Sequence, residues 1–153
     1  NTVLGLKDTQ PLSKGGRGID SQTHAKGEGT DISIITWGAM VQQSIDAVNS
    51  LSLGDGVVEI IDLRTLNPLD FSTISKSIKK TGKALVVHED NLTNGPGAEI
   101  SALISDRCFE MLDGPIRRVA SKDSHVPYNM YLEADVLPQV SDIEEALIEL
   151  LEY

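Results

Sequence analysis

Apolar residues in this chain occur in two patterns that alternate along its length. Short, nearly continuous runs rich in Ile and Val are typical of strands buried on both faces of a parallel sheet, and they cover residues 31–37, 57–62, 83–88 and 116–120. Between these runs the apolar residues recur every three or four positions, as in amphipathic helices, at 39–51, 71–80 and 98–111 and again after Pro138. The pattern predicts strands that alternate with single helices.

Residues suited to helix ends support these assignments. Asp70 precedes the helix at 71–80 and can accept hydrogen bonds from its free N–H groups, and Gly82 follows its last turn. Ser141 and Glu144 fit a capping box that opens the last helix. The stretch between the last strand and Pro138 is expected to be a long loop.

The alternation predicts an α/β fold of three layers, in which helices cover both faces of a mostly parallel sheet. In such sheets ligands and partners meet the carboxyl edge, where the parallel strands end. The residues expected at that edge are Trp37 and Gly38, Asp62 and Arg64, His88 and Glu89, and Ala120 and Ser121.

His88 is the first of these residues with possible chemistry. Beside Glu89 it could act as a general base or a metal ligand, but we expect a hydrogen-bonded structural histidine, because buried polar groups usually find partners. The sequence holds no phosphate-binding loop after a strand, no serine-hydrolase motif and no zinc-protease motif. No catalytic, cofactor-binding or metal-binding residue is therefore predicted.

The other polar residues of the edge are expected to be structural as well. We predict that Asp62 and Arg64 contact different neighbours rather than each other, and that they fix loops rather than bind a ligand. Gly38 ends a strand. Glu99 lies in the first turn of a helix, where its negative charge complements the helix dipole.

Composition narrows the possible partners. The 153 residues carry a formal net charge of −10, which argues against nucleic acid, because phosphate binding relies on Lys and Arg. A single cysteine, Cys108, and no apolar stretch of about 18 residues favour a reducing cytoplasm, or a mitochondrial matrix in a eukaryote, and no membrane contact. Seven acidic and no basic residues lie between Glu133 and Tyr153, a stretch expected to attract a basic protein surface.

The start of the chain differs from the rest, because it is rich in glycine and shows no periodicity. We assign residues 1–20 to a linker or arm and residues 21–153 to one domain. Residues 21–26 could add a short strand at an edge of the sheet. The chain opens at Asn1 without an initiator Met or a signal-like segment, which indicates a piece of a longer protein or a processed product.

Several short motifs, from about residue 28 onward, occur together in a combination that resembles one family. They are Gly29–Asp31, Thr36–Val41, Asp62–Asp70, Val87–Glu89, Gly97–Ile100, Pro115–Val119 and Pro127–Tyr128. The combination resembles the C-terminal domain of the transketolase superfamily, most of all that of the β subunit, or β half, of thiamin-diphosphate-dependent 2-oxoacid dehydrogenases. The form His88-Glu89 is more similar to the branched-chain members, with substrates such as 2-oxoisovalerate, than to the pyruvate members.

The resemblance implies features of the sheet, the cofactors and the partners that the hydrophobic pattern alone does not predict. It implies a five-stranded mixed sheet whose first strand, at 21–26, lies at an edge and runs antiparallel to the others. It also implies that thiamin diphosphate and magnesium are bound by other domains and the partner subunit, so that this domain alone is inactive. The implied partners are the α subunit or remaining domains, a dimer partner and the lipoyl acyltransferase.

The resemblance also implies a docking surface. In relatives that form multienzyme complexes, a small basic domain of the acyltransferase docks on acidic side chains and on the terminal carboxylate of this domain. The matching positions are Glu110, Asp113 and, if it is the native end, Tyr153. Two alternatives stay open: the same domain of a transketolase or related synthase, which has no acyltransferase partner, and a free-standing α/β module that binds a ligand at its carboxyl edge.

Overall fold

Five strands form one mixed sheet in the order β1-β3-β2-β4-β5. The computed structural model describes residues 24–26, 29–53 and 56–153. The strands are β1 (His24–Lys26), β2 (Ile32–Thr36), β3 (Val58–Asp62), β4 (Ala84–Asn91) and β5 (Ile116–Ser121). Strand β1 pairs antiparallel with β3, and the other neighbours are parallel. The predicted five-stranded mixed sheet is confirmed, whereas the predicted arm at 1–20 lies outside the described residues.

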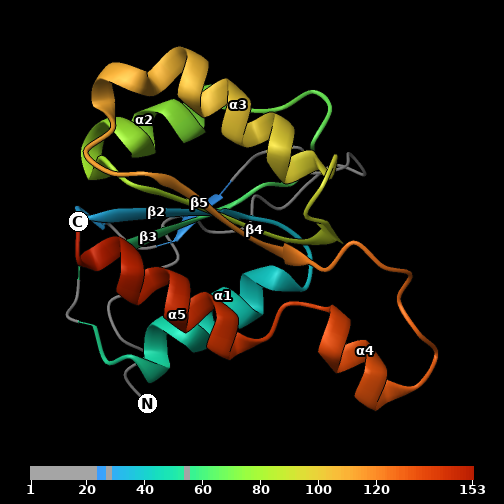
Figure 1. Ribbon diagram of the computed structural model, residues 1–153. Coiled ribbons are helices and arrows are strands. Elements are labelled where there is room, and N and C mark those ends of the chain that lie inside the picture. The colour runs from blue at the N-terminus through green and yellow to red at the C-terminus, as the bar shows by residue number, and fades with distance from the viewer. Residues whose placement is uncertain (1–23, 27–28, 54–55) are drawn as a thin grey trace, which may run out of the picture.

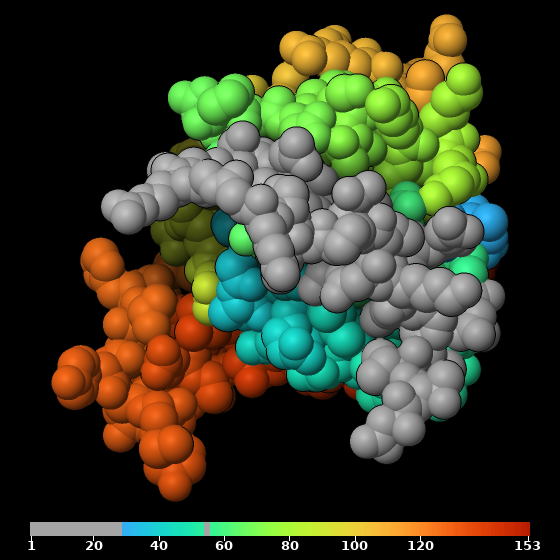
Figure 2. Space-filling model, turned by 180° about the vertical axis from the view of Figure 1, so that it is seen from behind, coloured from blue at the N-terminus to red at the C-terminus, as the bar shows by residue number. Residues whose placement is uncertain are grey.

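Helices cover both faces of this sheet, as Figure 1 shows. They are α1 (Met40–Ser50), α2 (Phe71–Thr81), α3 (Pro96–Cys108), α4 (Met130–Val136) and α5 (Val140–Leu151), with a short 3₁₀ helix, η1 (Phe109–Met111), after α3. Helices α1 and α5 lie on one face and α2 and α3 on the other, which gives the predicted three layers. Helix α4 stands apart from both layers, and in Figure 2 the orange part of the chain that includes it projects from the surface.

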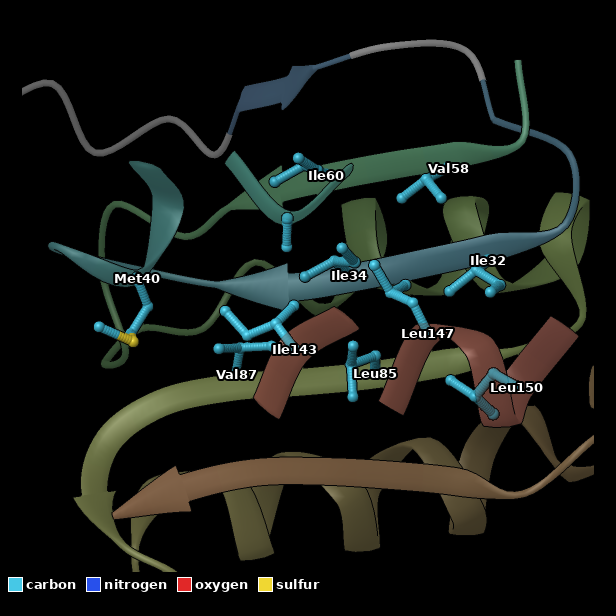
Figure 3. Close-up of a cluster of buried hydrophobic side chains, with 11 residues drawn as sticks. Ile32, Ile34, Met40, Val58, Ile60, Leu85, Val87, Ile143, Leu147 and Leu150 are labelled. Atoms are coloured by element: carbon cyan, nitrogen blue, oxygen red, sulfur yellow. The ribbon is translucent and has the colours of Figure 1, made fainter. Parts of the chain in front are cut away.

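Each face of the sheet buries its own apolar cluster, because successive strand residues point to opposite sides. On β2, Ile32 and Ile34 face the cluster under α1 and α5, whereas Ile35 belongs to the cluster under α2 and α3. Figure 3 shows the first cluster, in which Ile143 and Leu147 of α5 lie against the strands. The two clusters explain why the strand sequences are almost continuously apolar.

A buried chain of polar side chains joins β2 and β3 to α2. The Ser33 hydroxyl is 2.6 Å from the hydroxyls of both Ser77 and Thr81. The hydroxyl of Ser77 donates to the carboxylate of Glu59, which also accepts from Lys80 Nζ at 2.6 Å. Each polar atom of this group has a partner, which is what makes its burial tolerable.

Two predictions about the last third of the chain are wrong. The stretch expected to be a long loop contains α4, whose N-cap Asn129 accepts from the backbone N–H of Tyr131 at 2.9 Å. The capping box of α5 is formed by Gln139 and Asp142 rather than by Ser141 and Glu144. The backbone of Gln139 is extended, as is usual for an N-cap residue, so the helix begins earlier than the sequence pattern suggested.

Candidate functional site

Strands β2 and β4 are adjacent and parallel, and the direction of the strand connections reverses between them. We call the carboxyl edge of the sheet between these two strands the crevice position. From β2 the chain continues through α1 to β3, and from β4 it continues through α3 to β5 on the other side. Because the two connections leave in opposite directions and on opposite faces, the loops diverge here, and open α/β sheets commonly bind ligands at such a point.

Trp37 and His88 occupy this position. The register pairs Thr36 of β2 with Val87 of β4, so the next residue of each strand lies side by side. The two rings stack with centroids 5.3 Å apart and planes at 4°. The aromatic pair thus lies at the point where the loops diverge.

His88 is fully buried, and neither of its ring nitrogens lies in ordinary hydrogen-bond geometry with a partner among the described residues. The backbone of Asp90 lies close enough to act on the ring as a hydrogen-bond partner and to raise its pKa against the effect of burial. The hydrogen bond predicted for this residue therefore stays a prediction. Burial lowers the pKa of His88 below its ordinary value of 6.5, an effect that the carboxylate of Asp90 opposes and the charge of Arg118 reinforces. The neutral imidazole is thus the form that the fold favours.

Two glycines at the start of α3 make room for this ring. A Cβ on Gly97 would lie 2.1 Å from Nε2 of His88, and one on Gly95 would lie 3.0 Å from its Cε1 and 2.1 Å from the carbonyl oxygen of Asn91. No side chain fits at those distances. Gly97 is therefore required by the packing of His88, and Gly95 by the close approach of the Asn91 backbone.

Asp62 and Arg64 form an ion pair, with Nη1 and Oδ2 3.3 Å apart, and the prediction that they contact different neighbours is wrong. Residues i and i+2 of an extended segment lie on the same side, which lets this pair meet. With Gly38, whose φ is +62°, they line an open cavity of about 460 Å³ beside the start of α1.

Glu89 and Glu99 are both exposed. Glu89 borders an open cavity of about 560 Å³ between the ends of β4 and β5, where Asp123 accepts from the backbone and hydroxyl of Thr93 at 2.9 and 2.6 Å. These hydrogen bonds lower the pKa of Asp123. Glu99 lies in the first turn of α3, the position at which a carboxylate stabilises a helix.

The predicted docking residues lie away from this edge. Asp113 and Gly114 precede β5, and the Asp113 N–H donates to the carbonyl of Gly82, just before β4, at 2.8 Å. A Cβ on Gly114 would be 3.6 Å from the Cβ of Tyr153 and 3.4 Å from Cγ of Lys83. The structure therefore brings Asp113 and the end of α5 together at the amino edge, where the parallel strands begin, and Figure 1 shows the C-terminus there.

Glu110 belongs to the same stretch and lies in η1, with its side chain exposed like that of Asp113. Among residues 24–26, 29–53 and 56–153, no group of three or more His, Cys, Asp or Glu side chains is placed to hold a metal ion. Within the same part of the chain, no helix has the length and apolar character needed to cross a bilayer.

Comparison with known proteins decides the family. The family model described as "Transketolase, C-terminal domain" matches residues 21–143. The chain belongs to this family. The matched residues include all five strands and helices α1 to α4, and they end within α5.

Curated relatives of this transketolase C-terminal domain include β subunits of the pyruvate dehydrogenase E1 component. The Staphylococcus aureus protein is 45% identical over 132 residues, covering 86% of this chain and 40% of the relative. The Bacillus subtilis protein is 42% identical over 128 residues, covering 84% of this chain and 39% of the relative. The chain therefore spans about 40% of the length of the curated relatives it matches.

Solved structures show the same fold at lower identity. An inactive β4 tetramer of a split-gene transketolase superposes with a TM-score of 0.72 at 19% identity, covering 92% of this chain and 45% of that chain. A 2-oxoglutarate:ferredoxin oxidoreductase from Magnetococcus marinus gives a TM-score of 0.55 at 14% identity, covering 84% and 19%.

Reasoning from the sequence missed three features of this transketolase C-terminal domain. The stacking of Trp37 on His88 depends on strand register, which no local pattern encodes. The Glu59–Lys80 pair was hidden because a single Glu within an apolar strand gives no signal of its partner. Helix α4 was missed because its apolar residues follow one another instead of recurring with a helical period.

Proposed function

We propose that this chain is the C-terminal domain of the β subunit, or β half, of a thiamin-diphosphate-dependent 2-oxoacid dehydrogenase. In this role it is not catalytic by itself. It stabilises the assembly with the remaining domains, the α subunit and a dimer partner, and it presents a docking surface to the lipoyl acyltransferase.

The observation that supports this proposal is the approach of Gly114 to Tyr153 at the amino edge of the sheet, where a Cβ on Gly114 would be 3.6 Å from the Cβ of Tyr153. Asp113, whose carboxylate is exposed, directly precedes Gly114 in the chain. The stretch from Glu133 to Tyr153, with seven acidic and no basic residues, adds negative charge. A basic domain would be attracted to this edge and held by it.

Thiamin diphosphate and magnesium would be held by other parts of the enzyme. This part of the proposal is supported by the lack, among the described residues, of any group of three or more side chains placed to hold a metal ion. No catalytic step is therefore assigned to residues of this chain.

The proposed substrate class is a 2-oxoacid, and the finer proposal is a branched-chain 2-oxoacid such as 2-oxoisovalerate. The His88-Glu89 form supports the branched-chain substrate, whereas the names of the curated relatives favour pyruvate. Steady-state kinetics of the assembled enzyme with both substrates decides between them. A higher kcat/KM for 2-oxoisovalerate supports the finer proposal, and a higher value for pyruvate replaces it.

The docking role is tested with the binding domain of a lipoyl acyltransferase by surface plasmon resonance at low and high salt. Asp113→Asn is expected to slow association about two- to fivefold at low salt, corresponding to about 0.4–1 kcal/mol, and less at high salt. Removal of Tyr153 is expected to weaken binding as well. Lys83→Met should strengthen binding, because it removes a positive charge near Gly114.

Glu99→Gln is the matched control, since it removes the same charge from an exposed site at the other end of α3. The proposal fails if Glu99→Gln and Asp113→Asn have equal effects, or if no binding occurs at low salt. The latter result favours a transketolase or related synthase. Tight binding of nucleotides or phosphates, measured by calorimetry, would instead favour a free-standing ligand-binding module.

A further inference from the structure

Residues 126–132 carry an exposed apolar surface, which we call the α4 surface. Its large side chains are Val126, Tyr128, Met130, Tyr131 and Leu132, which are 52%, 108%, 71%, 77% and 54% exposed. Consecutive apolar side chains at this exposure are unusual for a surface that stays in water, and they commonly mark a contact with another protein surface.

The surface is built on an ordered element that lacks a packing partner in the described chain. Helix α4 has seven residues, none of them buried. Such a short helix is not stable by its own hydrogen bonds. It is nevertheless fixed at both ends, because Asn129 caps it and the Lys122 N–H donates to the Val136 carbonyl at 3.1 Å. Figures 1 and 2 show the element held away from the rest of the fold.

The topology indicates what lies nearby in a longer chain. Strand β1 is antiparallel, and its first residue, His24, pairs with Asp62 at the end of β3. The polypeptide therefore joins the sheet at the carboxyl edge. Strand β5 ends with Ser121 at the same edge and leads directly to the α4 surface. The start of β1 and the end of β5 therefore share the carboxyl edge, although the two strands are the opposite outer strands of the sheet.

The length of the related subunits and the charge of this chain indicate what kind of surface covers the α4 surface. The matched segment is 40% of the curated relatives, so most of such a subunit lies outside this chain. Three acidic residues, Asp123, Glu133 and Asp135, and one basic residue, Lys122, flank the α4 surface and leave it net negative, as is the chain with its net charge of −10. A second copy would place like charges opposite one another, which is unfavourable. The complementary surface is apolar at its centre and carries Lys or Arg at its rim.

We infer that the α4 surface is the contact through which this domain packs against the preceding domain of the same polypeptide. The inference rests on the proposed function, because that function supplies the preceding domain. Tyr128 and Tyr131 provide the main apolar contacts, and the flanking carboxylates pair with basic groups of the partner surface.

Limited proteolysis with chymotrypsin tests this inference. The 153-residue chain is expected to be cut after Tyr128 and Tyr131, and the full-length subunit is expected to be cut there at least about tenfold more slowly. Phe109 is the internal control, because it is 73% exposed and lies before β5, at the other edge of the sheet. Cleavage after Phe109 should be similar in both proteins.

Each alternative occupant gives a different result. Protection that appears only as the subunit concentration rises identifies a second copy, and protection that needs added α subunit identifies the α subunit. Either result overturns the inference, as does cleavage of the α4 surface at equal rates in both proteins. Resistance of the isolated chain at these sites overturns it too, because the surface would then not be free.

A paired variant gives an independent readout. The double variant Tyr128→Ser/Tyr131→Ser should lower the Tm of the full-length subunit by about 2–4 °C while leaving the Tm of the 153-residue chain unchanged. Phe109→Ser, the matched control, should lower neither. Equal shifts in both proteins would contradict the inference.

Failure of the inference differs from failure of the proposed function. If the gene encodes no thiamin-binding domain upstream of Asn1, sequencing alone ends the proposed function. An unprotected α4 surface in a subunit that docks the acyltransferase and supports turnover ends only the inference.

Discussion

His88 shows how one residue can determine the sequence around it. Its ring is buried against Trp37 on one side and against the start of α3 on the other. Both neighbours of Pro96 are therefore glycines, because a Cβ at either position would overlap the ring or the nearby backbone. The ring is thus held mainly by packing, because its nitrogens make no hydrogen bond of ordinary geometry to the described residues.

Gly97→Ala tests this packing. The new methyl group would lie 2.1 Å from Nε2 of His88, so we expect a loss of about 1–3 kcal/mol in the free energy of unfolding, measured by urea denaturation. Gly114→Ala is the control, because its nearest neighbour would be 3.4 Å away, and it should change stability by less than about 0.5 kcal/mol. Combining Gly97→Ala with His88→Ala should remove part of the clash, and strictly additive effects would show that His88 is not its cause.

His88 also predicts a dependence of stability on pH. Its pKa is lowered in the folded protein, so the unfolded chain binds the proton more readily. Stability is therefore fully present above the ordinary pKa of 6.5, and it decreases as the pH falls from there toward the pKa of the folded state. Asp123, whose pKa is lowered from 3.8, loses its contribution only at lower pH and does not affect this window.

Denaturant unfolding of the wild type and His88→Gln between pH 8 and pH 5 measures this effect. The wild type should lose more stability than the variant over this range, because the variant lacks the titrating ring. Parallel curves for the two proteins would mean that His88 does not titrate in this window.

At the scale of elements, α2 is anchored to the sheet by both apolar and polar contacts. Ile74 and Ile78 are fully buried in the cluster it shares with α3. Asp70 accepts from the Thr73 N–H at 3.1 Å, and Gly82 ends the helix with φ at +71°, as the sequence pattern predicted. The Glu59–Lys80 pair adds a link that no helix pattern reveals.

Replacing Lys80 tests that link. In Lys80→Met the buried carboxylate of Glu59 keeps only its hydrogen bond from Ser77, so we expect a loss of about 1–2 kcal/mol, a value reduced because Lys80 is 40% exposed. Lys79→Met removes an equal charge from an exposed neighbouring position and should cost less than about 0.5 kcal/mol. Thermal unfolding of both variants provides the comparison, and equal losses would contradict a specific role for the pair.

At the scale of the whole molecule, one sheet separates two apolar clusters, and every central strand contributes to both. A change in one cluster should therefore be felt in the other. Trp37 packs beside the α2 and α3 cluster and is the only tryptophan in the chain, so its fluorescence reports on that side.

Leu147→Ala removes a fully buried side chain from the opposite cluster. We expect a loss of about 2–5 kcal/mol, with Trp37 fluorescence and far-UV circular dichroism giving the same shifted midpoint. Separate midpoints for the two probes would show that the halves of the domain unfold independently.

The sequence by itself determined the alternation of strands β2 to β5 with helices α1, α2, α3 and α5, and the caps of α2. These features depend on residues that are close in the chain, since strand and helix periods and capping hydrogen bonds are local. The resemblance carried by the motifs added the antiparallel β1. The ion pair of Asp62 and Arg64 could also have been predicted from their spacing, because positions i and i+2 share a side.

Only the tertiary structure decided which distant residues meet. Strand register sets His88 beside Trp37, and the segment before β5 and the end of α5 set Gly114 beside Tyr153, although 51 and 39 positions separate these pairs. The exposure of the α4 surface likewise depends on what the rest of the fold leaves uncovered. Such contacts form when the chain folds back on itself and the two cores bring distant segments together. They depend on the whole chain, so no local sequence pattern contains them.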